Sequence, residues 1–252
     1  MLPILLSIGP VKIYSYGVCL ALGLFVSLYF WWKMGRDEHW DEINLFDGFF
    51  LSLITFLVVG RLGYVALHLE AVGTLQRALA VLAYPGVNAP VGIVASSWLM
   101  IYFARAHGWQ EWKVLDALVV ALSSVLIMAG LGGVLNGSRG SWQADVWALL
   151  WAIVSFAMVS RVRKNFRFYA WYKGESSMAQ EGLASLVFAL LIGIYYLVAP
   201  WIVQESWLIW RVPGQFVVGA LIVIGSIYLI QRRVGRREMG IWDKLKSILG
   251  RS

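Results

Sequence analysis

The chain of 252 residues is 60% hydrophobic and 14% charged, whereas an ordinary soluble domain is about 45–50% apolar and about 25% charged. This composition excludes a disordered chain, a coiled coil and a soluble enzyme. Because about 20 apolar residues span a bilayer, it predicts a polytopic membrane protein. The net charge of +7 does not indicate nucleic-acid binding, since the basic residues lie between apolar runs rather than on a soluble module.

The start of the chain, Met1 to Gly9, has no basic n-region and no small-residue cleavage site, so we expect that no signal peptide is removed. Beyond it, long apolar runs bounded by Pro, Gly and charged residues predict seven membrane-spanning helices. Their predicted bounds are 14–32, 44–68, 88–104, 114–135, 144–160, 182–203 and 212–230. The predicted fold class is therefore all-α, with a seven-helix transmembrane domain over residues 1–234.

The Lys and Arg residues between these spans predict an orientation. Of the 21 basic residues, 16 fall in alternate loops on one side and only four on the other. Since cytoplasmic loops carry the positive excess, we expect the N-terminus outside and the C-terminus in the cytoplasm. Residues 235–252 are predicted to form a cytoplasmic amphipathic helix on the membrane surface, and the aromatic and basic stretch from Asn165 to Lys173 is predicted to lie among the lipid headgroups.

Arg61 is the ionisable residue that lies deep inside a predicted span, where a charge costs about 2.5–3.5 kcal/mol to insert and usually marks a functional site. A guanidinium binds phosphate through two parallel hydrogen bonds. Gly60 and Gly63 would let a lipid headgroup or a neighbouring helix come close to it. Two interpretations stay open: Arg61 binds a phosphate or another anion, or it snorkels or pairs for structural reasons with an acid such as Asp47 or Asp116.

Three further polar residues stand at predicted span ends. Tyr16 lies at the external mouth of the first span, where an aromatic anchor is the alternative to a catalytic role. Asn136 follows the glycine-rich sequence AGLGG, whose backbone N–H groups could hold an anion, although Asn-Gly is also an ordinary turn signal. Gln215 opens the last span, where a polar helix cap is the simpler interpretation. The sequence has no Ser-His-Asp set, no HExxH and no Walker loop, and we expect neither a cofactor nor a bound metal.

Four motifs occur in the order found in the prolipoprotein diacylglyceryl transferase family, which the chain resembles over most of its length. They are SIGPVKIYSYG (7–17), VVGRLGYV (58–65), AGLGGVLNG (129–137) and PGQFVVGALIVIG (213–225). The resemblance implies a multi-pass enzyme of the bacterial cytoplasmic (inner) membrane with seven spans and its N-terminus outside. Such enzymes move the diacylglyceryl group of phosphatidylglycerol onto the lipobox cysteine thiol of a prolipoprotein.

The resemblance also implies a set of site residues and partners. The catalytic candidates are Arg61, Tyr16 and Asn136. The substrate-binding candidates are Gly60, Gly63, Tyr64, Gly92 and Gln215. The implied partners are phosphatidylglycerol or another anionic phospholipid, and the signal peptide of a prolipoprotein.

Several residues of the family pattern are absent from this chain. Pro90 stands where the family has the histidine of H-G-G, Gly130 and Gly133 replace the arginine and first asparagine of its signature, and Ser138 replaces an acid. The second family arginine maps to the apolar stretch 188–192. A thiol nucleophile needs a base or a positive field, and a phosphate leaving group needs fixed cations. The sequence therefore predicts a transferase-like protein with a degraded or altered site; the alternative is an inactive homologue that binds phospholipid or lipoprotein as an accessory or scaffold protein.

Overall fold

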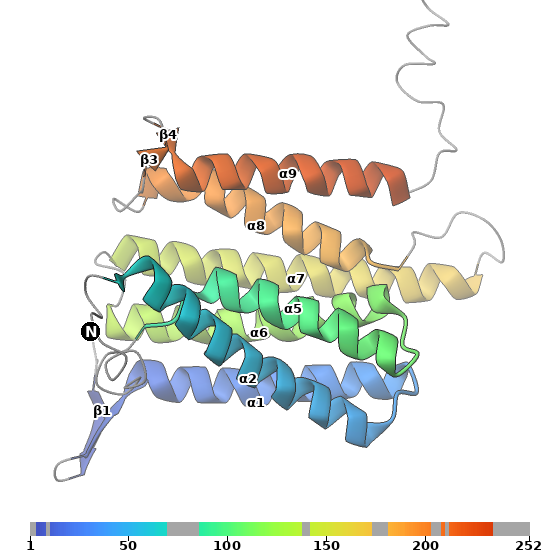
Figure 1. Ribbon diagram of the computed structural model, residues 1–252, viewed down its shortest axis with the longest axis horizontal. Helices are drawn as coiled ribbons and strands as arrows, with labels where there is room; N and C mark the ends of the chain where they lie inside the picture. Colours follow the sequence, from blue (N-terminus) through green and yellow to red (C-terminus); the bar gives the residue numbers. More distant parts are fainter. Residues whose placement is uncertain are drawn as a thin grey trace, which may run out of the picture. The chain divides into compact units, whose positions relative to one another are not determined.

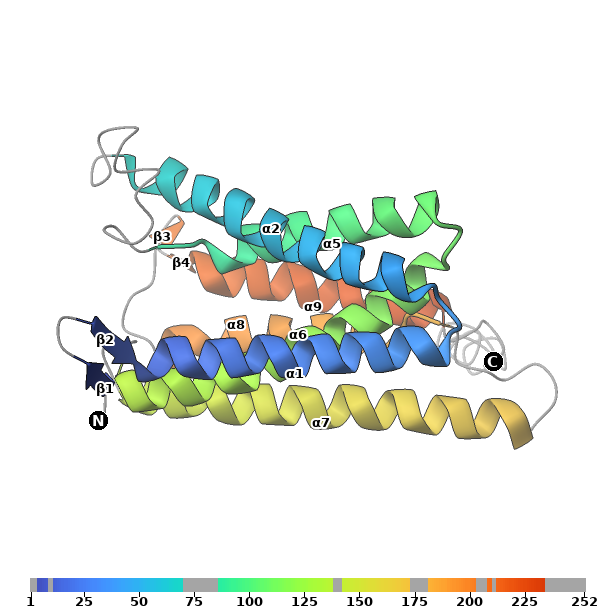
Figure 2. The same cartoon turned by 90° about the horizontal axis from the view of Figure 1, so that it is seen from below.

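The computed structural model describes residues 4–8, 11–69, 86–137, 142–172, 181–202, 208–209 and 212–233, and Figures 1 and 2 show them from two directions. The chain divides into two compact units. Unit 1 contains residues 1–26 and 122–252, and unit 2 contains residues 27–121. The divisions between the units fall inside two long helices, α1 (Ser15–Asp37) and α6 (Glu111–Asn136).

Seven helices of the described residues are long and apolar enough to cross a membrane, which confirms the predicted number of spans. Besides α1 and α6 they are α2 (Glu42–Leu67), α5 (Ala89–Ala106), α7 (Trp142–Tyr172), α8 (Leu183–Ile202) and α9 (Gly214–Arg233). The chain is therefore a multi-pass membrane protein of the all-α class.

The helix ends differ from the predicted span ends mainly in α7, which is 31 residues long. Its backbone stays helical through the basic residues that follow position 160 and through residues 165–172 of the predicted headgroup segment. A span predicted from apolar residues ends at the first charges, whereas helical hydrogen bonding continues beyond the membrane core. The predicted surface helix at 235–252 lies outside the described residues, and the orientation of the termini stays a prediction.

Two short antiparallel hairpins, which the sequence analysis did not predict, precede α1 and α9. The first pairs β1 (Ile4–Ile8) with β2 (Val11–Tyr14), with Ile8 opposite Val11, and the second pairs β3 (Leu208–Ile209) with β4 (Val212–Pro213). In each case the second strand runs directly into a helix, as Figure 2 shows for α1. The hairpins therefore fix where α1 and α9 begin, and with them the positions of Tyr16 and Gln215.

In unit 2, α2 and α5 lie side by side, as both views show (Figures 1 and 2). Small residues make this approach possible: a Cβ on Gly92 would lie 2.8 Å from the carbonyl oxygen of Phe56, and one on Gly48 would lie 3.3 Å from the ring of Phe103. Membrane helices commonly pack through such positions, because lipid supplies no hydrophobic force between them.

The turns at one end of unit 2 are joined by aromatic and ionic contacts. Trp40 between α1 and α2 stacks on Trp109 between α5 and α6, with ring centroids 4.7 Å apart and planes 8° apart. Lys113 at the start of α6 forms an ion pair of 2.9 Å with Glu38. These contacts place the start of α6 next to the turn from α1 to α2.

In unit 1, α6 contacts both α1 and α7 through glycines. A Cβ on Gly132 would lie 3.1 Å from the Cα of Tyr16, and a Cβ on Gly130 would lie 2.8 Å from the Cα of Leu149. The indole nitrogen of Trp151 on α7 donates to the carbonyl oxygen of Leu191 on α8 at 3.0 Å.

Helices α8 and α9 approach each other at Gly193 and Gly219, where a Cβ on Gly219 would meet the carbonyl oxygen of Gly193 at 2.8 Å. Figure 1 shows the two helices as neighbours. Their backbones are in contact, so neither glycine can carry a side chain without separating the helices.

Candidate functional site

Arg61 lies near the C-terminal end of α2 and is buried, with 7% of its surface exposed. Its Nη1 donates to the carbonyl oxygen of Gly86 at 2.9 Å, and its Cζ lies 5.5 Å from the centre of the Tyr64 ring. The guanidinium that donates this hydrogen bond is permanently charged, and a carbonyl oxygen is an acceptor that suits it. Arg61 therefore holds the segment that enters α5 and places a guanidinium at that end of unit 2.

The two acids proposed as structural partners for Arg61 are too far away to pair with it. Asp47 is on the same helix, 14 residues earlier, which places it about 21 Å away along the axis. Asp116 is three residues beyond Lys113, at the end of the unit where Lys113 pairs with Glu38. Arg61 is 19 residues into α2 from that end, about 28 Å along the helix. An ion pair with either acid is excluded, which corrects that part of the structural interpretation.

Gly60 and Gly63 bring the chain entering α5 against α2. The backbone N–H of Asn88 donates to the carbonyl oxygen of Gly60 at 2.9 Å. A Cβ on Gly60 would lie 2.7 Å from a methyl carbon of Val87, and one on Gly63 would lie 3.0 Å from Val91. The close approach expected at these glycines is therefore made by the protein's own chain. Their predicted role in substrate binding, like that of Gly92 in the contact with α5, stays a prediction.

The start of α5 is capped and carries the positive end of a helix dipole close to Arg61. The side chain of Asn88 accepts a hydrogen bond from the N–H of Val91 at 3.1 Å, and Pro90 occupies the first turn. The N-terminus of a helix carries roughly half a positive charge. Because Arg61 holds Gly86 two residues before this cap, the guanidinium and the helix terminus form one positive region in unit 2.

Tyr64 continues this region toward the end of α2. Its ring contacts the backbone of Gly86 so closely that a Cβ there would overlap the ring. On its other side the ring stacks on the imidazole of His68, with centroids 4.3 Å apart and planes 21° apart. Arg61, Tyr64 and His68 are three and four residues apart, so they share one face of α2. The sequence analysis did not select His68, although its spacing from Arg61 was visible.

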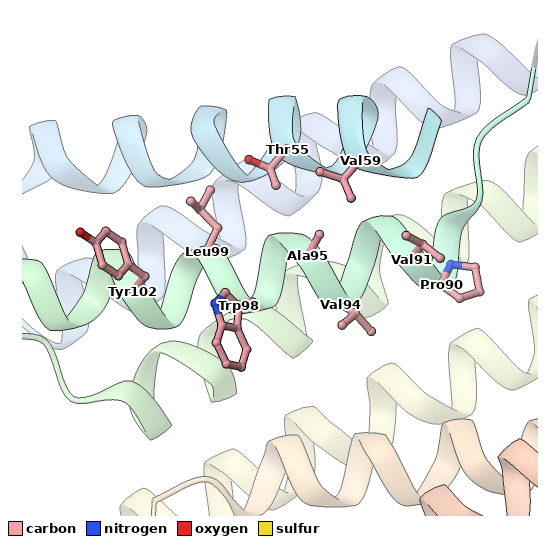
Figure 3. A pocket seen from close by; sticks show the side chains of 9 residues that line it. All are labelled: Thr55, Val59, Pro90, Val91, Val94, Ala95, Trp98, Leu99 and Tyr102. Atoms are coloured by element: carbon pink, nitrogen blue, oxygen red, sulfur yellow. The ribbon is translucent and has the colours of Figure 1, made fainter. Parts of the chain in front are cut away.

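An apolar groove of about 670 Å³ runs along α2 and α5 in the same unit (Figure 3). Thr55 and Val59 line it from α2, whereas most of the lining comes from α5. The α5 residues are Pro90, Val91, Val94, Ala95, Trp98, Leu99 and Tyr102. From Pro90 to Tyr102 the helix rises about 18 Å, which is comparable to one leaflet of a hydrocarbon core about 30 Å thick.

The other predicted site residues belong to unit 1. Tyr16 is on the first turn of α1 and partly exposed, and Asn136 is the last residue of α6. The contact of Gly132 with Tyr16 places both at the same end of the unit. Gln215 is in the first turn of α9. The structure thus brings Arg61, Gly60, Gly63, Tyr64 and Gly92 together in unit 2, and it places Tyr16 and Asn136 at a common end of unit 1.

Asp145 is a buried acid in unit 1 that the sequence analysis also did not select. It lies in the first turn of α7 and is 0% exposed. A carboxylate is stabilised at a helix N-terminus by the dipole, so its position in a first turn is favourable. Within the described ranges no group of three or more His, Cys, Asp and Glu side chains could hold a metal ion.

Gly130 stands where the resemblance places the arginine of the family signature. A Cβ at this position would lie 2.8 Å from the Cα and 3.2 Å from the backbone nitrogen of Leu149. The backbone of α7 therefore fills the space into which a side chain at position 130 would extend. A larger side chain at position 130 would have to displace α7 from α6.

Comparison with known proteins identifies the family of the chain. The family model described as prolipoprotein diacylglyceryl transferase matches residues 3–232. Proteins named phosphatidylglycerol–prolipoprotein diacylglyceryl transferase are similar to the chain. The one from Ectopseudomonas mendocina is 21% identical over 90% of this chain and 92% of its own length. The one from Streptococcus pyogenes is 24% identical over 95% of this chain and 97% of its own length.

Other relatives match only in part. The protein of the same name from Agrobacterium fabrum is 27% identical over 59% of this chain and 56% of its own length. In such alignments the chain spans about half the length of the relative. The match of the family model nevertheless covers nearly the whole chain, and the chain belongs to the prolipoprotein diacylglyceryl transferase family.

Proposed function

We propose that this protein transfers the diacylglyceryl group of phosphatidylglycerol to the cysteine thiol of a prolipoprotein in the bacterial cytoplasmic membrane, through a site altered from the family pattern. The observation that carries the proposal is the buried Arg61, held beside the start of α5 in a chain of this family. The names of the relatives supply the two substrates.

The positive region at Arg61 supports binding of the phosphate of phosphatidylglycerol. In the transfer, the leaving group is a glycerol phosphate, and fixed positive charge stabilises the charge that develops on it. Arg61 brings a permanent cation, and the first turn of α5 adds the positive end of its dipole. The hydrogen bond from Arg61 to Gly86 keeps the guanidinium and the helix terminus in a fixed relation.

The groove along α2 and α5 supports binding of an acyl chain. It begins at Pro90 and Val91, which are in the first turn of α5 next to Gly63. Its lining is apolar apart from the hydroxyl groups of Thr55 and Tyr102 and the indole nitrogen of Trp98. A phospholipid with its phosphate near Arg61 could therefore extend a chain along the groove without burying unpaired polar groups.

The alternative function is that of an inactive homologue that binds phospholipid or lipoprotein as an accessory or scaffold protein. What favours it is the resemblance, which places a histidine of the family at Pro90 and an arginine of the family at Gly130. Removing a single stabilising donor from a transition state costs about 10²–10³ in rate. Loss of both groups would abolish the reaction unless other residues supply their chemistry.

Depletion rescue separates the two functions. The full chain is expressed in a bacterium depleted of its own transferase, and a reporter lipoprotein is analysed by mass spectrometry. The proposed function predicts growth and a reporter that carries the diacylglyceryl mass. A protein that is present in the membrane in normal amounts and leaves the reporter unmodified would contradict the transferase and favour the alternative.

Arg61→Ala tests the headgroup contact in the same cells, with Arg105→Ala as its matched control. Arg105 is an exposed arginine that pairs with Glu111 at the opposite end of unit 2. We expect Arg61→Ala to lose rescue and to co-purify with less phosphatidylglycerol, whereas Arg105→Ala keeps both. Equal lipid content in the two variants would show that Arg61 does not hold the headgroup.

A further inference from the structure

His68 ends α2 in a position that orients its ring. Its Nδ1 lies 3.0 Å from the carbonyl oxygen of Tyr64, which also accepts the backbone N–H of His68 at 3.1 Å. A carbonyl oxygen only accepts hydrogen bonds, so the contact is a hydrogen bond in the tautomer that carries a proton on Nδ1. In that tautomer the neutral ring presents Nε2 with its lone pair. His68 is exposed, so Nε2 can reach a substrate.

The stacking of His68 on Tyr64 orients this ring relative to Arg61. Tyr64 lies between the two side chains, with its ring centre 5.5 Å from the Cζ of Arg61 and 4.3 Å from the ring centre of His68. Along the axis, Arg61 and His68 are two helical turns apart, about 11 Å. A substrate thiol that is hydrogen-bonded to His68 would lie about 3 Å from it, and a phosphate that is hydrogen-bonded to Arg61 would lie about 3 Å from that side chain. About 5 Å remains for the carbon and oxygen that join an attacking sulfur to a phosphorus.

The other histidine of unit 2 at a helix end shows which part of this arrangement is specific. His107 caps α5 in the same manner, with Nδ1 2.9 Å from the carbonyl oxygen of Phe103 and its ring stacked on Phe103. The bond and the stacking are therefore a common way to end these helices. His107 is at the end of the unit that holds the Trp40–Trp109 stack, away from Arg61. Of the two histidines, it is His68 that combines the cap with the positive region.

We propose that His68 is the general base that removes the proton from the acceptor thiol. The inference rests on the proposed function and gives the site a base in a chain that has Pro90 where the family pattern has a histidine. A free thiol is mostly protonated at neutral pH, and the thiolate is the nucleophile. The charged group that faces His68 within the described residues is Arg61, through Tyr64. The segment 86–91, which packs on Tyr64, contributes no titratable side chain.

The chemical step balances without any further reagent. The thiol proton moves to Nε2 of His68, and the sulfur attacks the glyceryl carbon that is bonded to the phosphate oxygen. The carbon–sulfur bond forms as the carbon–oxygen bond breaks, and the electron pair leaves on glycerol phosphate, next to the cation of Arg61. The imidazolium then returns its proton to water, which reaches the exposed ring.

The test measures transfer to a synthetic lipobox peptide by the purified full chain in phosphatidylglycerol vesicles, as a function of pH. At neutral pH, His68→Ala should lower kcat about 10²–10⁴-fold and leave the KM for phosphatidylglycerol unchanged. The difference in kcat between His68→Ala and the unmodified chain should become smaller above about pH 9, where the thiol ionises without a base. Imidazole in the buffer should restore part of the rate of the variant. His107→Ala should keep the activity of the unmodified chain.

The outcomes separate this inference from the proposed function. An active unmodified chain together with a His68→Ala variant of equal activity would overturn the role of His68 alone. So would a loss that is the same at every pH and that imidazole does not relieve, since a structural defect behaves in that way. An unmodified chain that folds and transfers nothing would contradict the proposed function, and the role of His68 with it.

Discussion

Replacing Gly60 with alanine adds one methyl group at the contact between α2 and the chain entering α5. The added Cβ would lie 2.7 Å from a methyl carbon of Val87 and 3.2 Å from the carbonyl oxygen of Asn88. Val87 can rotate, but the backbone at Asn88 must move. That movement would stretch the hydrogen bond from Asn88 to Gly60, now 2.9 Å, and shift Gly86 relative to Arg61.

Two opposing effects set the size of the change. Extra methyl groups in a packed interior cost about 1–3 kcal/mol, whereas alanine stabilises a helix by about 1 kcal/mol relative to glycine. Gly225→Ala on α9 is the matched control, since a Cβ there meets nothing within 4 Å. The free energies of unfolding of the two variants should therefore differ by about 1–3 kcal/mol, with Gly60→Ala the less stable.

Thermal unfolding of both variants in the same detergent measures this difference. At about 2–4 °C for each kcal/mol, Gly60→Ala should melt about 5 °C below Gly225→Ala. We also expect Gly60→Ala to bind phosphatidylglycerol more weakly, because Gly86 and the start of α5 move away from Arg61. Equal melting temperatures and equal lipid binding would refute the reasoning, since they would show that the segment 86–88 is not held against α2.

Three further substitutions test the packing. Gly130→Arg, which restores the arginine of the family signature, should lower stability by more than about 2 kcal/mol and add no transferase activity, because the backbone of Leu149 occupies the space; a more active variant would contradict this. Trp31→Phe removes the 2.8 Å hydrogen bond to the carbonyl oxygen of Leu45, which should lower the free energy of unfolding in denaturant by about 0.5–1.5 kcal/mol. An unchanged denaturation midpoint would show that this bond contributes nothing to stability. Gly219→Ala should destabilise more than Gly225→Ala, because its Cβ meets the backbone of α8; similar stabilities would mean that α8 and α9 can separate freely.

The fold was predictable from the sequence wherever one physical requirement dominates. A span needs about 20 apolar residues, and seven such runs give the seven helices. The hairpins before α1 and α9 were missed because strands of two to five residues carry little pattern of their own. The length of α7 was underestimated because hydropathy marks the membrane core and not the end of helical hydrogen bonding.

The candidate site was predictable only in part. Arg61 stands out because a charge in an apolar run is rare. Its partner, the carbonyl oxygen of Gly86, could not be found, since every residue carries such an oxygen and the contact spans 25 positions. Helical rise alone already excluded Asp47 as a partner, and the spacing of Arg61, Tyr64 and His68 already placed all three on one face.

The most direct test of the central claim uses the purified chain, phosphatidylglycerol and a lipobox peptide, with the peptide mass and the released glycerol phosphate measured together. The account predicts that the peptide gains the diacylglyceryl mass, that glycerol phosphate appears in equal amount, and that Arg61→Ala abolishes both while Arg105→Ala does not. A folded protein that binds phosphatidylglycerol but leaves the peptide mass unchanged would contradict it.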